Sequence, residues 1–168
     1  MKLYHGSTVP VMAPNVNFAQ VGRDFGAAFY TTDIYEQAER WALRKALIAS
    51  KQKGYNTTAI VSEYDFDEIG AENALKILRF VNPDYEWLNL VVNCRTNPAY
   101  VHGYDIVIGK VANDAVGETV NYVAQGIMRE EDALERLRFQ KINNQIAFCT
   151  GKALKYIAYV RRIEVAAK

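Results

Sequence analysis

Segments with strand-like and helix-like patterns follow one another along this chain without regular alternation. Apolar and β-branched stretches typical of strands occur at residues 2–5, 29–32 and 57–66, and only the last two are separated by a helical pattern, at residues 33–54. Folds built on a doubly wound parallel sheet instead place a helix between successive strands. The order of elements therefore predicts an α+β domain.

Three residues mark the limits of the first helix. Asp33 is followed by Glu36, a spacing that resembles a capping box with Asp in place of Ser or Thr. Gly54 is expected to end this helix, because glycine accepts the left-handed conformation common after a helix C-terminus.

A second helix is expected to have Pro83 at its first position, where the missing N–H costs no hydrogen bond.

The second half of the chain continues the mixture. Helices are expected at residues 114–125, from apolar residues at helical spacing, and at residues 129–140, which begin with acidic residues that suit a helix N-terminus. Strands are expected at residues 75–81, 104–109, 145–150 and 157–165.

Length and charge limit the class of protein. The 168 residues suit one domain covering residues 1–168, and half of them are apolar, which is typical of an ordered globular protein. Twenty basic and nineteen acidic residues leave a net charge of +1, which does not indicate a nucleic-acid or membrane-surface binder. No apolar run approaches a membrane span, and no apolar signal segment follows Met1, so we expect a cytoplasmic protein without a membrane partner.

The two cysteines, Cys94 and Cys149, lie far apart in the sequence. Neither has the spacing of a metal site or a redox motif. We therefore expect two buried free thiols in a reducing compartment and no bound metal.

The first candidate site is His5-Gly6-Ser7, at the end of the first predicted strand. A histidine followed by glycine at a strand exit can offer an imidazole, a bare backbone and a hydroxyl group to one ligand. The alternative is a surface histidine beside an ordinary turn.

Two further groups are candidates for the same ligand. Phe29 and Tyr30, with Trp41 on the following helix, can form a slot for a flat ring, or can simply belong to the core. Asn143-Asn144-Gln145 stands before an apolar strand, where polar amides are usually turn residues.

In this order the three groups resemble the His-Tyr-Glu class of ADP-ribosyltransferases, which contains diphtheria toxin and the poly(ADP-ribose) polymerases. The matching pieces are residues 3–7, 25–32 and 144–149. Nearly the whole chain also resembles a bacterial family of uncharacterised domains of this size, through Tyr-His-Gly-Ser, Asp-Phe-Gly-x-x-Phe-Tyr-Thr-Thr, Gln-Ala-x-x-Trp-Ala and the segment at 104–114. The resemblance implies one domain whose split mixed and antiparallel sheets form an NAD cleft flanked by helices.

The resemblance also implies roles for the residues around the ribose and phosphates of NAD. His5 matches the histidine that contacts a ribose hydroxyl, and Gly6 matches the glycine whose backbone holds the nicotinamide amide. Ser7 is assigned to a ribose as well. Arg23, in the loop before the aromatic strand, is assigned to the pyrophosphate, because its guanidinium suits phosphate oxygens.

The nicotinamide ring is assigned to the aromatic residues. Tyr30 matches the tyrosine under the ring, Phe29 stands beside it, and Trp41 stands at the offset of a second tyrosine that covers the other face in the polymerases. His5, Tyr30 and the residue at 145 are the expected catalytic group.

Gln145 departs from the resemblance, since the family has a catalytic glutamate there. Glutamine keeps an acceptor oxygen but has no charge to stabilise a cation-like sugar, a loss worth several kcal/mol in electrostatic catalysis. Three outcomes are then open. The domain transfers a single ADP-ribose slowly or with help from a charged acceptor, it uses another carboxylate such as Glu118 or Glu135, or it binds NAD or another ligand without chemistry. Elongation to a polymer is the least expected outcome.

The expected function is that of a mono-ADP-ribosyltransferase that moves ADP-ribose from NAD to a protein or nucleic acid. The resemblance further implies a bacterial toxin paired with a small antitoxin protein. The alternatives are an inactive NAD-binding module, a scaffold for an interaction with such a partner, and a hydrolase that releases free ADP-ribose from NAD.

Overall fold

Two β-sheets form the centre of the computed structural model, which describes residues 1–16, 22–111, 114–138 and 143–166. The first sheet is fully antiparallel and has the order β1-β3-β7, with β1 Lys2–Ser7, β3 Ala59–Phe66 and β7 Ile157–Val165. The second has the order β2-β6-β5-β4, with β2 Phe29–Thr31, β6 Asn143–Phe148, β5 Ile106–Val111 and β4 Ile77–Arg79, and only β4 and β5 are parallel. The predicted α+β class with two sheets is confirmed.

One bridge joins the two sheets where β1 meets the end of β2. The backbone of Tyr4 exchanges two hydrogen bonds with the backbone of Thr32, with N···O distances of 2.8 and 2.9 Å. This junction brings the His-Gly strand next to the aromatic strand, although about twenty residues separate them in the sequence.

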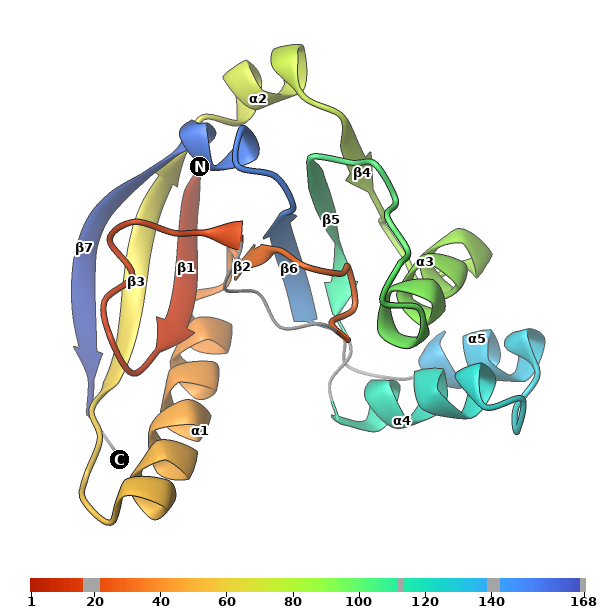
Figure 1. Ribbon diagram of the computed structural model, residues 1–168, viewed down its shortest axis with the longest axis horizontal. Helices are drawn as coiled ribbons and strands as arrows, with labels where there is room; N and C mark the ends of the chain where they lie inside the picture. The colour runs from red at the N-terminus through yellow and green to blue at the C-terminus, as the bar shows by residue number, and fades with distance from the viewer. Residues whose placement is uncertain (17–21, 112–113, 139–142, 167–168) are drawn as a thin grey trace.

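Five α-helices surround the sheets in the described part of the chain (Figure 1). They are α1 Tyr35–Lys53, α2 Glu68–Ala74, α3 Tyr85–Thr96, α4 Asp114–Ala124 and α5 Glu130–Arg138. The first, α1, packs along β1 and β3, whereas α3, α4 and α5 pack together beside the second sheet. A short 3₁₀ helix at Ala153–Tyr156 leads into β7.

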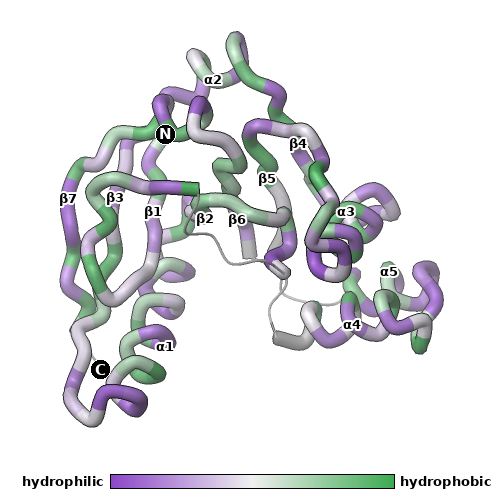
Figure 2. The backbone as a smooth tube through the Cα atoms, viewed as in Figure 1, coloured by the Kyte–Doolittle hydropathy of each residue, from purple (hydrophilic) through white to green (hydrophobic). Residues whose placement is uncertain are grey.

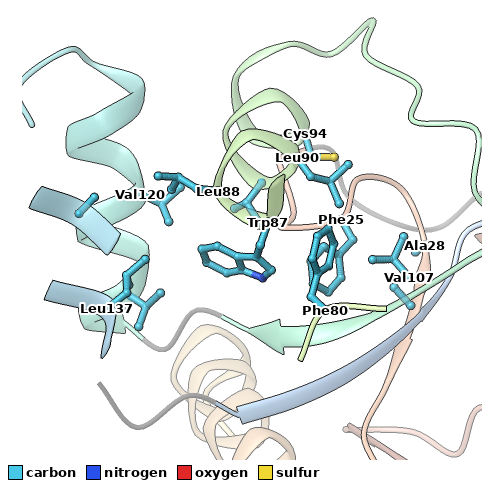
Figure 3. Close-up of a cluster of buried hydrophobic side chains, with 14 residues drawn as sticks. Phe25, Ala28, Phe80, Trp87, Leu88, Leu90, Cys94, Val107, Val120 and Leu137 are labelled. Atoms are coloured by element: carbon cyan, nitrogen blue, oxygen red, sulfur yellow. The ribbon is translucent and has the colours of Figure 1, made fainter. Parts of the chain in front are cut away.

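The hydrophobic cluster under the second sheet is centred on Trp87. Its ring lies between Val120 and Leu137 on one side and Phe25 and Phe80 on the other (Figure 3), and all five side chains are buried. Since Phe25 belongs to the loop before β2, this cluster anchors that loop to α3. The first half of β5 is hydrophobic, in keeping with its burial in the sheet (Figure 2). The outer helix α5 is largely hydrophilic, as is usual for a helix with one face in solvent.

The start of α1 differs from the prediction. The N-cap is Ile34, with no side-chain cap, so Asp33 does not cap the helix. Thr32 instead accepts a hydrogen bond from the Ile34 backbone N–H at 3.1 Å, and Asp33 accepts one from the Asn144 amide at 2.9 Å. A contact with a distant strand has replaced the local cap. The predicted end at Gly54 is confirmed, with a left-handed φ of 74°.

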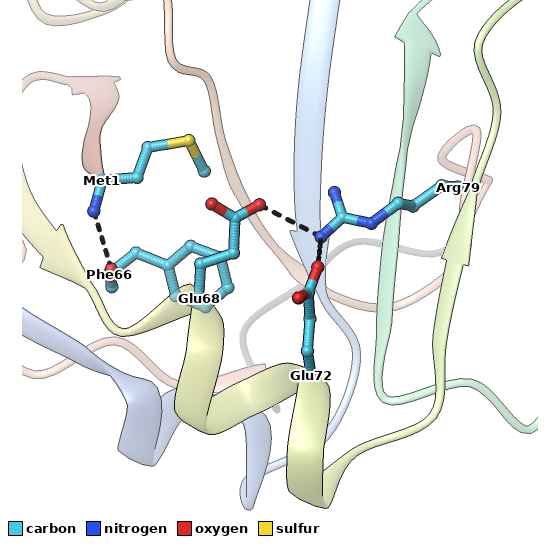
Figure 4. Close-up of polar contacts among 5 residues, drawn as sticks. All are labelled: Met1, Phe66, Glu68, Glu72 and Arg79. Atoms are coloured by element: carbon cyan, nitrogen blue, oxygen red, sulfur yellow. Dashed lines mark hydrogen bonds and ion pairs between the residues drawn. The ribbon is translucent and has the colours of Figure 1, made fainter.

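The region between β3 and α3 also differs from the prediction. Pro83 was predicted at the first position of the helix that the structure shows as α3, but it lies before that helix. Asp84 is the N-cap of α3 and accepts a hydrogen bond from the Trp87 N–H at 2.8 Å. The strand predicted at 75–81 is confined to β4, and the unpredicted helix α2 precedes it. Arg79 on β4 holds this helix through Glu68 at 3.0 Å and Glu72 at 2.5 Å (Figure 4).

The N-terminal end of α2 is tied to the first sheet. Beside it, the Met1 amino group donates to the Phe66 carbonyl at 2.9 Å, as Figure 4 shows. Asp67 then caps α2 by accepting from the Gly70 N–H at 3.0 Å. The helix therefore serves as the connection between the last residues of β3 and the second sheet.

Cys94 and Cys149 are both free, as predicted, but only Cys94 is fully buried and Cys149 is partly exposed. Desolvation raises their thiol pKa values to about 11 and about 12. Among the described helices, none is both long and apolar enough to cross a membrane.

Gly6 lets β1 approach the backbone of α1 very closely. A Cβ atom at this position would lie 2.2 Å from the Ala38 carbonyl oxygen and 2.8 Å from the Ala42 nitrogen. The small residues Ala38, Ala42 and Ala46 form the buried face of α1 that makes this approach possible. The glycine of the His-Gly motif therefore has a packing role of its own.

Gly6→Ala is expected to destabilise the protein by about 2 kcal/mol or more, because strand and helix must separate to admit the methyl group. The free energy of unfolding in urea measures the effect. Gly151→Ala is the matched control, since nothing lies within 4 Å of a Cβ added there. Equal stability of the two variants would contradict the close packing of β1 on α1.

Candidate functional site

A cavity of about 1190 Å³ lies between α1 and α4 and is also lined by β1, β2, β6 and the loop before β2. It exceeds the volume of about 300–1,000 Å³ common for small-molecule sites. The predicted site residues that line it are His5, Gly6, Arg23, Phe29, Tyr30, Trp41 and Gln145. Ser7, at the end of β1, is not among the lining residues, so its predicted ribose contact has no support in this geometry.

The His5 ring is held by the neighbouring strand. Its Nδ1 lies 2.6 Å from the Tyr30 carbonyl oxygen, and the ring stacks on Phe29 at a centroid distance of 4.7 Å. Since a carbonyl can only accept, Nδ1 carries the proton and Nε2 is an acceptor. Burial, aided by the positive charge of Lys45, lowers the His5 pKa to about 4. The imidazole is therefore neutral near pH 7.

Tyr30 connects the strand to the preceding loop. Its hydroxyl donates to the Gly26 carbonyl at 2.6 Å and accepts from the Phe25 N–H at 3.2 Å. Burial raises the Tyr30 pKa well above its usual value. Because both hydroxyl contacts lie in the loop, the ring is fixed as part of the cavity wall.

Phe29 has a supporting position. It is 6% exposed, packs edge-to-face on Tyr64 at a centroid distance of 5.6 Å and stacks on His5. This buried ring therefore sets the orientation of the imidazole more than it offers a free surface to a ligand.

Trp41 is 41% exposed and lines the cavity from α1, so it is not part of the core. Arg44 Cζ and Lys45 Nζ each lie 5.9 Å from the centroid of its ring, within cation–π range. Lys45 also donates to the Gly6 carbonyl at 3.1 Å. Burial, and then the charge of Arg23, lowers the Lys45 pKa to about 8.

The cavity concentrates positive charge in a chain that is almost neutral overall. Its basic lining residues are Arg23, Arg40, Arg44, Lys45 and Arg95, and its acidic lining residues are Asp24 and Glu118. Such an excess in a concave site favours an anionic ligand. The basic residues on α1 were missed from the sequence, although Arg44 and Lys45 follow the predicted Trp41 at the three- and four-residue spacing of one helix face.

Arg95 on α3 ties the rim of the cavity together. Its guanidinium lies 2.6 Å from Asp24, a carboxylate only 6% exposed, and 3.4 Å from the Asn121 side-chain oxygen on α4. Nothing in the sequence around Arg95 indicated this position, because its partners come from a distant loop and a distant helix.

Gln145 lies on β6 opposite Gly109 and lines the cavity. It is the third residue of a strand that starts at Asn143 and ends at Phe148, which corrects the predicted limits of 145–150. The neighbouring Asn144 carbonyl accepts from the Gln37 amide on α1 at 2.9 Å. This contact fixes the strand against the helix that carries Trp41.

The two carboxylates named as substitutes for the missing glutamate are separated by the fold. Glu118 on α4 lines the cavity, whereas Glu135 on α5 does not. Within the described ranges, no group of three His, Cys, Asp or Glu side chains is placed to hold a metal ion.

The low pKa of His5 makes stability depend on pH. Between its unfolded value of 6.5 and its folded value of about 4, the unfolded chain binds a proton that the folded chain does not. The stabilisation from neutral His5 is therefore complete above about pH 6.5 and is lost as the pH falls toward 4.

His5→Asn keeps a donor for the Tyr30 carbonyl but cannot titrate. Its free energy of unfolding in urea is expected to fall less than that of the wild type between about pH 7.5 and about pH 5. His102, whose pKa burial also lowers, titrates in both proteins and cancels from the comparison. An equal fall in both would contradict the lowered pKa of His5.

The model of a protein family described as of unknown function (DUF3990) matches residues 1–159 of the chain. The match contains all the lining residues of the cavity. No curated protein and no solved structure matches the chain.

Proposed function

The chain belongs to the DUF3990 family, and from the geometry of its cavity we propose that it is a mono-ADP-ribosyltransferase that uses NAD as co-substrate. One observation carries the proposal. His5, Gly6, Tyr30, Trp41 and Gln145, assigned to NAD from separate parts of the sequence, line one cavity with an excess of basic side chains.

In the proposed complex, nicotinamide lies between Tyr30 and Trp41, in keeping with the preference of flat rings for aromatic walls. The unprotonated Nε2 of His5 accepts a hydrogen bond from a ribose hydroxyl. Because the His5 pKa is about 4, Nε2 stays unprotonated near pH 7 and remains free to accept this hydrogen bond.

The backbone of Gly6 takes the nicotinamide amide. Its carbonyl accepts from Lys45 at 3.1 Å and keeps a second lone pair for the amide. Lys45 lies beside Arg23 and Arg44 in the lining, and these cations are the proposed partners of the pyrophosphate, whose two charges suit this side of the cavity.

The proposed reaction breaks the bond between the ribose C1 atom and the nicotinamide nitrogen. Nicotinamide leaves with the electron pair, and an acceptor nucleophile on a protein or nucleic acid forms the new bond to C1. Gln145 offers an amide oxygen to the ribose hydroxyls but no negative charge, so transfer of one ADP-ribose fits the site better than polymer formation.

The neutral Gln145 also supports a second candidate, an NAD-binding module of the same fold without catalysis. The two candidates share the binding mode and differ only in the fate of the bond to nicotinamide. The cytoplasmic location, the toxin role and the small antitoxin partner are proposed with the transferase, and their support is the resemblance of the sequence alone.

Transfer of labelled ADP-ribose from NAD to lysate protein, RNA or DNA tests the enzyme. Trp41→Ala is expected to reduce transfer at least tenfold, because nicotinamide loses one wall of its slot. Leu47→Ala, an exposed residue of α1 outside the cavity lining, is the matched control and should keep full activity. No labelled product with any acceptor would contradict the transferase.

Calorimetry with NAD separates the two candidates. Arg44→Gln is expected to weaken NAD binding about tenfold in either case, because a charged partner of the phosphates is lost. Lys51→Gln, at the end of the same helix and outside the cavity lining, should leave the affinity unchanged. NAD binding without nicotinamide release would favour the binding module, and absence of binding would contradict both.

A further inference from the structure

The wall formed by α4 is chemically different from the wall formed by α1. The α4 residues that line the cavity are Gly117, Glu118, Asn121, Tyr122 and Gln125, and Glu118 alone among them carries a charge. The opposite wall holds Arg40, Arg44 and Lys45. An anionic dinucleotide is drawn to the basic wall, which leaves the α4 wall for a second, uncharged reactant.

Two carboxylates face this cavity, and they differ in access. Asp24 is 6% exposed and lies 2.6 Å from the Arg95 guanidinium, so it is neutralised within the rim. The Glu118 side chain is 51% exposed. Among the described lining residues, Glu118 is therefore the carboxylate that a bound molecule can reach.

Two neighbours hold Glu118 in place. One of its oxygens accepts from the Tyr122 hydroxyl at 2.7 Å, and the other lies 3.6 Å from the Arg136 guanidinium on α5. Tyr122 lies one helical turn further along α4 and also lines the cavity. Each carboxylate oxygen has two lone pairs, so Glu118 can accept a further hydrogen bond from a ligand.

We infer that Glu118 is the general base of this site and that the α4 wall binds an acceptor whose nucleophile must lose a proton, such as a hydroxyl or an amide N–H. This inference rests on the proposed transferase. An acceptor that attacks through a carboxylate does not fit, because it needs no base and would be repelled by Glu118.

The step balances as follows for an acceptor hydroxyl. The hydroxyl proton passes to the Glu118 carboxylate as the oxygen bonds to the ribose C1 atom. The C1–nicotinamide bond breaks, and neutral nicotinamide leaves with the electron pair. Glu118 then releases the proton to water. The negative charge that Gln145 on β6 lacks thus acts from α4, on the nucleophile instead of the sugar.

Glu118→Gln tests the inference on the full chain. Transfer of labelled ADP-ribose is expected to fall about 100-fold, the lower range for loss of a general base. NAD affinity by calorimetry and the thermal midpoint should stay at wild-type values. Glu135→Gln, the same change on α5 outside the cavity lining, should leave all three measurements unchanged.

Azide provides a readout that a structural role for Glu118 would not produce. It is already an anion, so it needs no base and attacks C1 to form ADP-ribosyl azide and nicotinamide. Sodium azide should raise nicotinamide release by Glu118→Gln toward the wild-type rate, with the azide product detected by mass spectrometry. Tyr122→Phe, which removes only the hydroxyl donor, should reduce transfer less than Glu118→Gln.

The outcomes separate the two levels of the proposal. Two results with an active wild type would overturn the role of Glu118 and leave the transferase standing. In the first, Glu118→Gln is as active as Glu135→Gln. In the second, Glu118→Gln loses activity and azide does not restore it. A wild type that neither binds NAD nor releases nicotinamide overturns the transferase and this inference together.

Discussion

The hydrogen bond from the His5 ring to the Tyr30 carbonyl joins the two sheets in the wall of the cavity. It continues the backbone pairing of Tyr4 with Thr32, so β1 and β2 are held in one register at the junction. The same bond sets the imidazole tautomer and leaves Nε2 as an acceptor. Both the shape of the cavity and the chemistry of its central group follow from this one contact.

The arrangement of α1 depends on the same junction. Gly6 follows His5 directly, and its missing side chain brings the backbone of α1 against β1. The alanine face of the helix turns inward as a result, and the adjacent face carries Trp41 and Lys45 into the cavity. A nearly neutral chain thus acquires a basic wall, because one helix face collects cations while the remaining charges are distributed elsewhere on the protein.

The elements with strong local signals agree with their sequence-based predictions. The last strand, β7, has its predicted limits of 157–165, and Gly54 ends α1 as expected. The predictions are wrong where a distant partner replaces a local one. Asp33 contacts Asn144 instead of capping its helix, and the short apolar run after α2 finds only a three-residue pairing with β5. Capping rules describe neighbours in the chain, and they carry no information about a strand that arrives from over a hundred residues away.

For the site, the sequence by itself determined which residue types stand at the end of β1, on β2 and on β6, and their order indicated one shared ligand. The tertiary structure decided which of them meet: it brings His5, Tyr30 and Gln145 to one cavity and leaves Ser7 out. It also added Arg95 and separated Glu118 from Glu135, which lie on adjacent helices with only one facing the cavity. The physical reason is that a motif records side-chain chemistry, whereas access and charge at a cavity depend on how helices from distant segments pack around it.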